Sequence, residues 1–367
     1  MAFFPHEAAV APEVSVSWGF LDGLGTPPCY VGPDGAFVIA PAYDDARGFS
    51  EGLAAAKRDG KWGYIDKTGS WVIEPDLEDA RDFHQGLAAA RDPQSHQWGY
   101  VDKSGAWAVA PAWKTALPFC EEGVAPVGKQ VGVRTSTQTT AQPVDGYGLI
   151  DRTGAEVVAV RAMDDPDRWQ SLESFSDGVA VVQVADRYGL VRPDGTFAVA
   201  PGFDRLGKQV EGLAPAEDGK KWGYIDATCA WAIPARYRMA ASLSEGWAVV
   251  TDDTGVLHID ASGTPAYDTH FRNARPRTGG YAAVEAKHKW GFIDATANNM
   301  RVPPTYAKVG DVSFADGRGI VGRDAGSDYE WGWVDTTGAE GSQWFADVDR
   351  DGLSEGLLAV RVPRPEK

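Results

Sequence analysis

Residues 49–75 read FSEGLAAAKRDGKWGYIDKTGSWVIEP, and residues 83–111 repeat this phrase as FHQGLAAARDPQSHQWGYVDKSGAWAVAP. Shorter versions return along the chain as far as LSEGLLAVRV, which begins at Leu353. One glycine marks each copy, and it stands at positions 52, 86, 123, 178, 212, 246, 280, 317 and 356. Most neighbouring pairs are 34 to 39 residues apart, and one gap is 55 residues. Such a period predicts an array of about nine similar supersecondary units.

Each copy predicts a three-stranded antiparallel unit of about 34 residues. The apolar run LAAAK forms a first strand, and Asp59-Gly60 provides the positive φ that a tight hairpin turn needs. WGYID forms a second strand, and the turn KTG leads to a third strand, SWVIEP, which ends at a proline that cannot donate a ladder bond. One helical turn would fit within YDDARGF, residues 43–49. The fold class is therefore all-β.

A stacked array needs no domain boundary, since neighbouring units share their core. We therefore predict a single domain over residues 1–367. It comprises an N-terminal partial unit (14–48), regular units (49–127), a loop insertion (128–146), further units (147–352) and a terminal strand (353–363). The 55-residue gap is the one place where a joint between two parts is expected.

The tandem KWGYIDKTG, followed about 20 residues later by F-x-E-G-L-A, resembles the WG repeat family of bacterial proteins. The resemblance runs from about Trp18 to Val360 and is most specific at Lys61–Gly69, Trp98–Gly105 and Lys221–Asp226. It implies a β-repeat architecture and a binding role, and it implies no reaction. The copies that depart from the pattern should be less regular; they carry Tyr147-Gly148, Tyr188-Gly189 with Arg192 in place of the aspartate, and Val256-Leu257.

The two ends of the array are both incomplete. WGFLD (Trp18–Asp22) has no EGLAAA before it, and the strand Leu357–Pro363 has no WGYID after it. A terminal strand that completes the first unit would close a propeller-like ring. An open superhelical solenoid with incomplete end units is the other architecture that this pattern allows.

The charge balance limits the classes of partner. The chain has 35 Lys and Arg against 52 Asp and Glu, a net charge of −17. Nucleic acids and anionic membrane surfaces are bound through an excess of positive charge, so neither is expected as a partner. An acidic surface attracts basic proteins instead.

No motif for an enzyme, a metal site or a cofactor is present. The six histidines form no HExxH pair, and no nucleotide-binding or nucleophile-elbow motif occurs. The three cysteines (Cys29, Cys120 and Cys229) are too few and too scattered for a disulfide framework. The start, MAFFPHEAAV, is a poor secretory signal, and no apolar run of about 18 residues occurs. We expect a non-enzymatic cytoplasmic protein without metal or cofactor.

The repeated residues have structural explanations. The aspartate at the end of WGYID, as in Asp66, is placed to accept backbone N–H groups of the turn. The tryptophan of WG, as in Trp62, predicts a core ring beside a backbone that comes close at the glycine. A second aromatic position could be either core or an exposed binding strip; it is occupied by Phe37, Trp71, Trp107, Phe197 and Trp231.

Insertions in the turn between the first two strands give the candidate binding residues. This turn is lengthened to ARDPQSHQ in the second unit, to Gly128–Gly146 in the third and to Gly322–Glu330 in the eighth. Equivalent turns should project from one rim, which is where repeat proteins often bind partners. A further lengthening, Val160–Ser174, follows a third strand. We predict that partner contacts come from Arg134, Asp145, Asp164, Asp165, Asp167, Trp169, Asp324, Asp328, Tyr329 and Glu330.

These observations lead to one main functional hypothesis and two alternatives. The main hypothesis is a scaffold that binds a basic protein partner, and in its sharper form an immunity protein that neutralises a bacterial toxin, as the family resemblance implies. One alternative is binding of a polysaccharide or cell-wall fragment through exposed Trp71, Trp107 and Trp231. The other is a hydrolase with carboxylates in a central groove, for which no motif argues.

Overall fold

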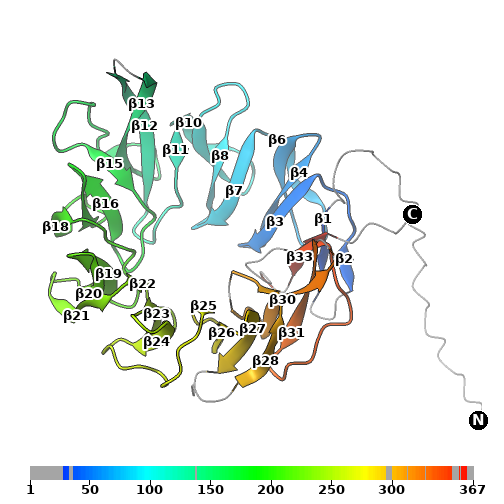
Figure 1. The fold of residues 1–367 in the computed structure, drawn as a ribbon. Coiled ribbons are helices and arrows are strands. Elements are labelled where there is room, and N and C mark those ends of the chain that lie inside the picture. The colour runs from blue at the N-terminus through cyan, green and yellow to red at the C-terminus, as the bar shows by residue number, and fades with distance from the viewer. Residues whose placement is uncertain are drawn as a thin grey trace, which may run out of the picture.

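A computed structural model of the chain describes residues 28–32, 36–136, 139–294, 300–311, 313–326, 328–348, 355 and 357–361. These residues form antiparallel sheets and no helix. In Figure 1 the sheets follow one another around a ring, and within a sheet the strand order runs from the centre outward. The prediction of an all-β fold is confirmed.

The first half of the ring is built from four-stranded units. One sheet contains β3 (Asp45–Ser50), β4 (Leu53–Arg58), β5 (Lys61–Ile65) and β6 (Trp71–Leu77), and the next contains β7 (Asp79–His84), β8 (Leu87–Arg91), β9 (Trp98–Asp102) and β10 (Trp107–Trp113). Two further units are joined into one eight-stranded sheet: β11 (Thr115–Ala116), β12 (Val124–Ser136), β13 (Thr139–Asp151), β14 (Glu156–Val158), β15 (Trp169–Leu172), β16 (Ala180–Val184), β17 (Arg187–Val191) and β18 (Phe197–Phe203).

The second half is built from three sheets of three strands and one sheet of four strands. These are β19 (Leu213–Asp218), β20 (Lys221–Asp226) and β21 (Trp231–Tyr237); β22 (Met239–Ala240), β23 (Trp247–Thr251) and β24 (Val256–Asp260); β25 (Asn273–Ala274), β26 (Tyr281–Ala286), β27 (Lys289–Asp294) and β28 (Met300–Tyr306); and β29 (Lys308–Val309), β30 (Arg318–Ala325) and β31 (Asp328–Asp335).

The remaining sheet joins the two ends of the described chain. Its order is β2 (Phe37–Ile39), β1 (Pro28–Val31), β33 (Leu358–Arg361) and β32 (Asp347–Val348). Antiparallel pairing runs from Pro28 opposite Arg361 to Val31 opposite Leu358. The last strand therefore completes a unit begun at the other end, as the ring alternative requires. Trp18–Asp22, which we expected to receive it, lies outside the described residues, and PCYV takes the place of WGYI.

Several units have a fourth strand that the sequence did not predict, and one helical turn was wrongly allowed within residues 43–49. Residues Asp45–Ser50 are strand β3, paired with β4 from Asp45 opposite Lys57 to Ser50 opposite Leu53. The turn between them is Glu51-Gly52, and both residues have positive φ, 53° and 84°. Positive φ at two successive residues is the requirement of a type I′ hairpin turn, so the glutamate-glycine pair folds the preceding segment back as a strand.

The WG glycines Gly63, Gly99, Gly223 and Gly291 are required because the backbone of the next strand comes close to them. A Cβ on Gly63 would lie 2.4 Å from the carbonyl oxygen of Ile73, and one on Gly223 would lie 2.4 Å from that of Ile233. At this point the register between β5 and β6 shifts, which marks a bulge in the outer strand. The sheet containing β24 lacks this glycine, and its outer segment makes only isolated bridges at Pro265 and Phe271. The expected irregularity of that unit is confirmed, whereas the unit of Tyr188-Gly189 keeps a full outer strand, β18.

The core lies between neighbouring sheets. One apolar cluster combines Leu53, Trp62 and Tyr64 of one sheet with Phe83 and Ala88 of the next. Four tryptophans of WG are buried, with exposed fractions of 6% at Trp62, 8% at Trp98 and Trp290, and 5% at Trp331, and Trp222 is partly buried. Strands β4 and β5 are buried on both faces, which explains their continuous apolar runs.

Carboxylates of the Glu-Gly turns link consecutive units. Glu51 accepts the backbone N–H of Gly86 at 3.0 Å, and Glu211 accepts that of Gly246 at 2.8 Å. Glu245 does the same for Gly280 at 2.9 Å. At the join between the chain ends, Glu355 accepts the N–H of Gly52 at 3.1 Å and pairs with Lys67 at 3.1 Å. The same contact therefore holds the closing joint and the internal joints.

We expect Gly223→Ala to lower the free energy of unfolding by about 1–3 kcal/mol, because the added Cβ meets backbone that cannot move aside. Urea unfolding measures this change. Gly202→Ala is the matched control, because its Cβ would have only one neighbour, at 3.8 Å, and its effect should stay within about 0.5 kcal/mol. Equal effects of the two substitutions would contradict this account of the WG glycine.

We expect Glu355→Ala and Glu51→Ala to destabilise the chain similarly, by about 1 kcal/mol each, because each removes one carboxylate-to-N–H contact between units that is partly exposed. Thermal unfolding of the two variants measures the effects. A large effect of Glu51→Ala with none for Glu355→Ala would mean that the closing joint is not formed in solution.

Candidate functional site

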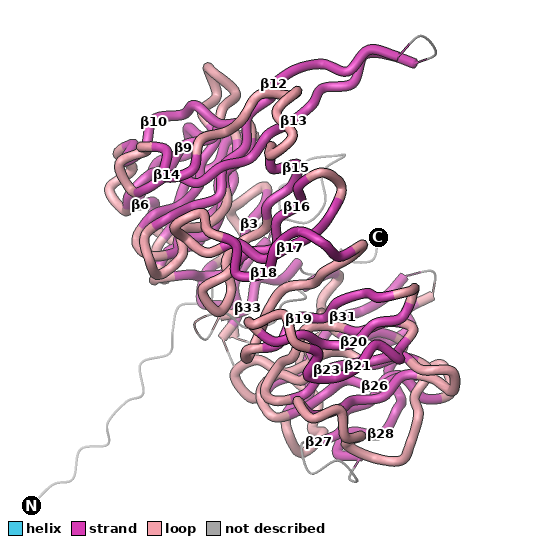
Figure 2. The backbone as a smooth tube through the Cα atoms, turned by 90° about the vertical axis from the view of Figure 1, so that its left-hand side faces the viewer, coloured by secondary structure: helices cyan, strands magenta, loops and turns pink. Residues whose placement is uncertain are grey.

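The third-unit insertion forms the most prominent surface feature of the ring. Strands β12 and β13 continue together well past their neighbours, from Val124 opposite Asp151 to Ser136 opposite Thr139. Figure 2 shows this hairpin standing away from the rest of the molecule. Of the predicted residues, Arg134 lies on the projecting part, paired with Gln142, and Asp145 lies near its base. Asp145 forms an ion pair with Lys114 at 2.7 Å.

The loop between β14 and β15 packs against the base of this hairpin. Met163 lies against Gly132, where an added Cβ would be 2.8 Å from its sulfur atom. Arg161 pairs with Asp165 at 3.3 Å and lies 3.7 Å from Asp167. Arg168 is buried and donates to the carbonyl oxygen of Asp145. Asp164 is exposed.

Trp169 differs from the other predicted residues of this region. Its side chain is only 6% exposed, and it packs in a cluster with Leu149, Leu172 and Val182. The indole is therefore part of the core between two units, because β15 is an inner strand rather than a surface loop. At the hairpin base, Arg161 contacts Asp165 and Asp167, and Arg168 donates to the carbonyl oxygen of Asp145. The structure therefore does bring these three predicted aspartates together.

The eighth-unit insertion lies elsewhere. Asp324, Asp328, Tyr329 and Glu330 belong to the hairpin β30–β31, and Figure 1 places this hairpin across the ring from β12–β13. Asp324 pairs with Lys289 at 2.9 Å, Glu330 pairs with Arg323 at 2.7 Å, and Lys308 lies 5.2 Å from the Tyr329 ring centroid. The predicted residues therefore form two separate groups, because equivalent turns on different sheets point outward from different parts of a ring.

A cavity of about 530 Å³ lies beside the closing joint. Its wall includes Asp45 and Arg47 of β3, Asp347 of β32, Arg361 of β33, and Asp82 and Asp311. Asp45 pairs with Arg361 at 3.1 Å, and Asp311 pairs with Arg275 at 3.2 Å. No sequence pattern indicated this cavity, since strands from both chain ends form its wall.

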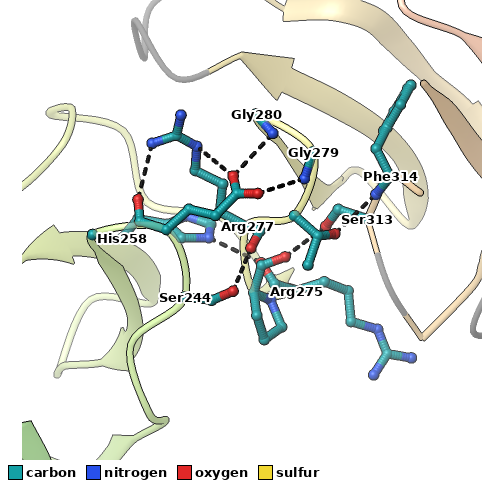
Figure 3. Close-up of polar contacts among 12 residues, drawn as sticks. Ser244, His258, Arg275, Arg277, Gly279, Gly280, Ser313 and Phe314 are labelled. Carbon is teal, nitrogen blue, oxygen red and sulfur yellow. Dashed lines mark hydrogen bonds and ion pairs between the residues drawn. The ribbon is translucent and has the colours of Figure 1, made fainter. Parts of the chain in front are cut away.

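A second polar group lies between the sheets of β22–β24 and β25–β28 (Figure 3). His258 Nε2 lies 2.9 Å from the carbonyl oxygen of Arg275, and Nδ1 lies 2.5 Å from the Tyr267 hydroxyl. Glu245 accepts the N–H groups of Gly279 and Gly280 at 2.7 and 2.9 Å and lies 3.4 Å from Arg277 Nε.

This group extends to a third sheet. Ser244 donates to the carbonyl oxygen of Arg277 at 2.5 Å, and Ser313 donates to that of Pro276 at 2.7 Å. Burial lowers the pKa of His258, the Arg275 carbonyl opposes this shift, and the Arg277 charge adds to it. A neutral, fully hydrogen-bonded imidazole of this kind is suited to holding sheets together rather than to proton transfer.

The second aromatic position faces solvent on most outer strands. Exposed fractions are 49% for Phe37, 36% for Trp107, 42% for Phe197 and 38% for Trp231. Trp71 is half-buried, with the Arg58 guanidinium 4.9 Å from its ring centroid. These positions begin the outer strands β2, β6, β10, β18 and β21. The sequence analysis left a core position and an exposed binding strip as alternatives. The structure places the rings of Phe37, Trp107, Phe197 and Trp231 on the outer surface.

The repeated aspartates are structural, as predicted. Asp66 accepts bonds from the Thr68 N–H at 2.8 Å, the Thr68 hydroxyl at 2.6 Å and the Ser70 N–H at 3.1 Å. The same set recurs at Asp102, Asp151, Asp226, Asp260 and Asp335. The Thr68 hydroxyl is the main cause of the lowered pKa of Asp66. In the unit where Arg192 replaces the repeated aspartate, Asp194 accepts the N–H and the hydroxyl of Thr196 instead.

Among the described residues, no group of three or more His, Cys, Asp or Glu side chains is placed to hold a metal ion. Within the same part of the chain, no helix could span a membrane. Burial raises the pKa of the Cys29 thiol to about 12, so this cysteine is not a nucleophile at neutral pH.

Comparison with known proteins identifies the repeat. The model of the family described as WG containing repeat matches residues 30–62, 62–92, 98–130, 188–222 and 222–253. These matches omit residues 131–187, which hold the projecting hairpin and the loop packed on it. Among curated protein sequences, no significant relative was found.

Solved structures show the likeness of the fold. The crystal structure of the eukaryotic initiation factor aligns over 91% of this chain and 98% of its own, with a TM-score of 0.56 and 10% identity. Apo AztD from Citrobacter koseri covers 75% of this chain and 90% of its own at a TM-score of 0.40 and 16% identity. The dihydro-heme d1 dehydrogenase NirN covers 92% of this chain and 79% of its own, with a TM-score of 0.44 and 12% identity. The arrangement of sheets is propeller-like.

Proposed function

The chain is a WG-repeat protein, and we propose that it is a non-enzymatic scaffold that binds a protein partner. The observation that carries this proposal is the hairpin β12–β13, which leaves the ring at a place where the repeat itself is interrupted. Loops that depart from a regular scaffold are where binding residues concentrate. The partner surface comprises Arg134, Asp145, Asp164, Asp165 and Asp167, with Asp324, Asp328, Tyr329 and Glu330 as a second surface.

The sharper form of the proposal is an immunity protein that neutralises a bacterial toxin in the cytoplasm. The net charge of −17 supports a basic partner, because complementary charge steers association. The cavity beside the closing joint supports the same choice, since four of its wall residues are aspartates and two are arginines. We further propose that the nine glycine-marked units are nine radial units of one closed ring, two of which share the eight-stranded sheet.

Affinity capture with two variants tests the scaffold proposal. In the first, Asn-Gly replaces residues 130–145 and joins Lys129 to Gly146, which already lie opposite each other. In the control, the turn Asp92–Gln97 on a different sheet is shortened instead. A single protein captured in stoichiometric amount by the full chain and the control, and lost by the first variant, is the expected result. Capture that is unaffected by the loss of the hairpin would overturn the assignment of this surface.

Salt dependence tests the proposed basic partner. Raising salt from about 50 to about 500 mM should slow association markedly, because exposed charges are screened over a shorter distance. Stopped-flow or surface-based kinetics with the captured protein measures this rate. An association rate that does not change with salt would remove the electrostatic part of the proposal.

Binding of a polysaccharide or cell-wall fragment is a second candidate, favoured by the exposed rings of Trp107 and Trp231. Soluble glycans should then quench tryptophan fluorescence of the chain, and the double substitution Trp107→Ala with Trp231→Ala should remove the quenching. Met239→Ala is a control, since Met239 is 66% exposed but lies on the inner strand β22. If no glycan changes the fluorescence, this candidate has no support.

A further inference from the structure

One hydrogen bond recurs at four of the joints between units. The tyrosine of the WGYI strand donates its hydroxyl proton to a backbone carbonyl 17 residues later, on the first strand of the next unit or directly after it. It is formed by Tyr64 to Arg81 at 2.6 Å, by Tyr100 to Leu117 at 2.7 Å and by Tyr224 to Ala241 at 2.7 Å. Tyr30 forms the same bond to Arg47 at 2.7 Å. Burial raises the pKa of Tyr64, so these hydroxyls stay neutral.

At four other joints Leu149, Leu190, Phe292 and Trp333 occupy the tyrosine position and cannot make this bond. One further joint makes it with a different side chain. His258 occupies the tyrosine position of β24, and it lies 2% exposed at the contact with the next sheet. Its Nε2 faces the carbonyl oxygen of Arg275, again 17 residues later, at 2.9 Å. A carbonyl only accepts, so Nε2 carries the proton. Histidine thus replaces tyrosine in the same bond, and it is the side chain that titrates near neutral pH.

The ring contact at this joint is changed as well. At three joints the tyrosine packs against a phenylalanine of the next unit, as Tyr64 does with Phe83 at a centroid distance of 4.7 Å. The residue in that place opposite His258 is Arg277, which lines a small pocket together with His258, Tyr267 and Trp247. A guanidinium therefore stands where those three joints have an apolar ring.

The hydrogen bonds of this site are complete only when His258 is neutral. Nε2 donates to Arg275, and Nδ1 accepts from the Tyr267 hydroxyl at 2.5 Å. The Tyr267 oxygen in turn accepts the backbone N–H of His258 at 3.2 Å. A second proton on Nδ1 would point at Tyr267 and force its O–H to turn away from the imidazole. A buried hydroxyl that loses its acceptor costs free energy.

The charged groups around His258 are also arranged against a second proton. Arg277 faces the imidazole from β25–β26 and pairs with Glu245 at 3.4 Å. Asp294 also lines the pocket, but it pairs with Arg301 at 2.6 Å. The Arg275 guanidinium is directed to Asp311 at 3.2 Å. The two carboxylates near His258, those of Glu245 and Asp294, are thus each paired with an arginine. Burial and the Arg277 charge lower the pKa of His258.

We propose that the joint between the sheets of β22–β24 and β25–β28 is an acid-sensitive joint, which loosens when His258 takes up a proton. The unfolded chain binds this proton near the ordinary histidine pKa of about 6.5, whereas the folded joint resists it. The contribution of His258 to stability is therefore complete above about pH 6.5 and is lost as the pH falls below it. At the joints of Tyr64, Tyr100 and Tyr224, burial raises the pKa of the hydroxyl that makes this bond, so the bond itself does not titrate in this range.

Hydrogen exchange of the full chain at about pH 7.5 and about pH 5.5, corrected for the intrinsic exchange rate, tests this proposal. Protection of Val256–Asp260 and Asn273–Ala286 should fall relative to that of Lys61–Ile65 and Asp79–His84. One proton changes an opening equilibrium by at most about tenfold for each pH unit. In His258→Gln, whose amide can donate to Arg275 and accept from Tyr267 without titrating, this selective loss should disappear.

Two further measurements keep the proposal falsifiable if one variant folds poorly. NMR titration of the wild-type chain reports the His258 pKa directly, and a value at or above the ordinary histidine value would overturn the proposal. Tyr64→His moves a titratable group to a different joint, and acid sensitivity should then also appear at Lys61–Ile65. Equal loss of protection in wild type and His258→Gln would mean that another group is responsible.

Discussion

Burial of one side chain of each WGYI strand against the next sheet is the contact on which the arrangement of sheets depends. Each sheet has too few strands to bury its own side chains, so its apolar residues are covered only by its neighbours. At four joints this side chain is a tyrosine whose buried hydroxyl must find an acceptor; for Tyr64 the carbonyl of Arg81 satisfies it in one relative position of the two sheets. Repeating the buried contact, with tyrosine, histidine or an apolar residue at this position, generates the ring.

The closing joint follows from the same constraint. Strand β1 at one end and strand β33 at the other are each an unpaired edge until they pair with each other. Tyr30 of β1 then makes the same bond to Arg47 that internal joints make, and Glu355 makes the same contact to Gly52 that Glu51 makes to Gly86. Closure therefore needs no special element, only residues that fit the repeated contact. His258 satisfies that contact by a group that can change its charge.

The repeated residues leave little freedom for binding. The tryptophans of WG are in the core, the strand-end aspartates hold their own turns, and the Glu-Gly carboxylates link units. What remains for recognition is what the repeat does not use: the hairpin β12–β13, the loop packed on Gly132, and the outer aromatic rings. This division explains why the candidate surfaces lie at interruptions of the repeat and at the outer strands. The proposal of a scaffold role rests on that division.

The sequence by itself determined three strands of the regular unit, the turns and the period, because these depend on neighbours within about ten residues: Asp66 and its turn, Gly63 and its strand, and the all-β class were all predictable, whereas the additional inner strand, such as β3, was not. It also indicated the loop insertions and two possible architectures. Only the tertiary structure decided that β33 pairs with β1, that Trp169 is buried while Trp107 is exposed, and that the predicted residues form two groups across the ring. These outcomes depend on which surfaces of distant units meet. The residue pattern along one strand does not show which of its two faces is buried, because that is decided by the neighbouring sheet that covers it.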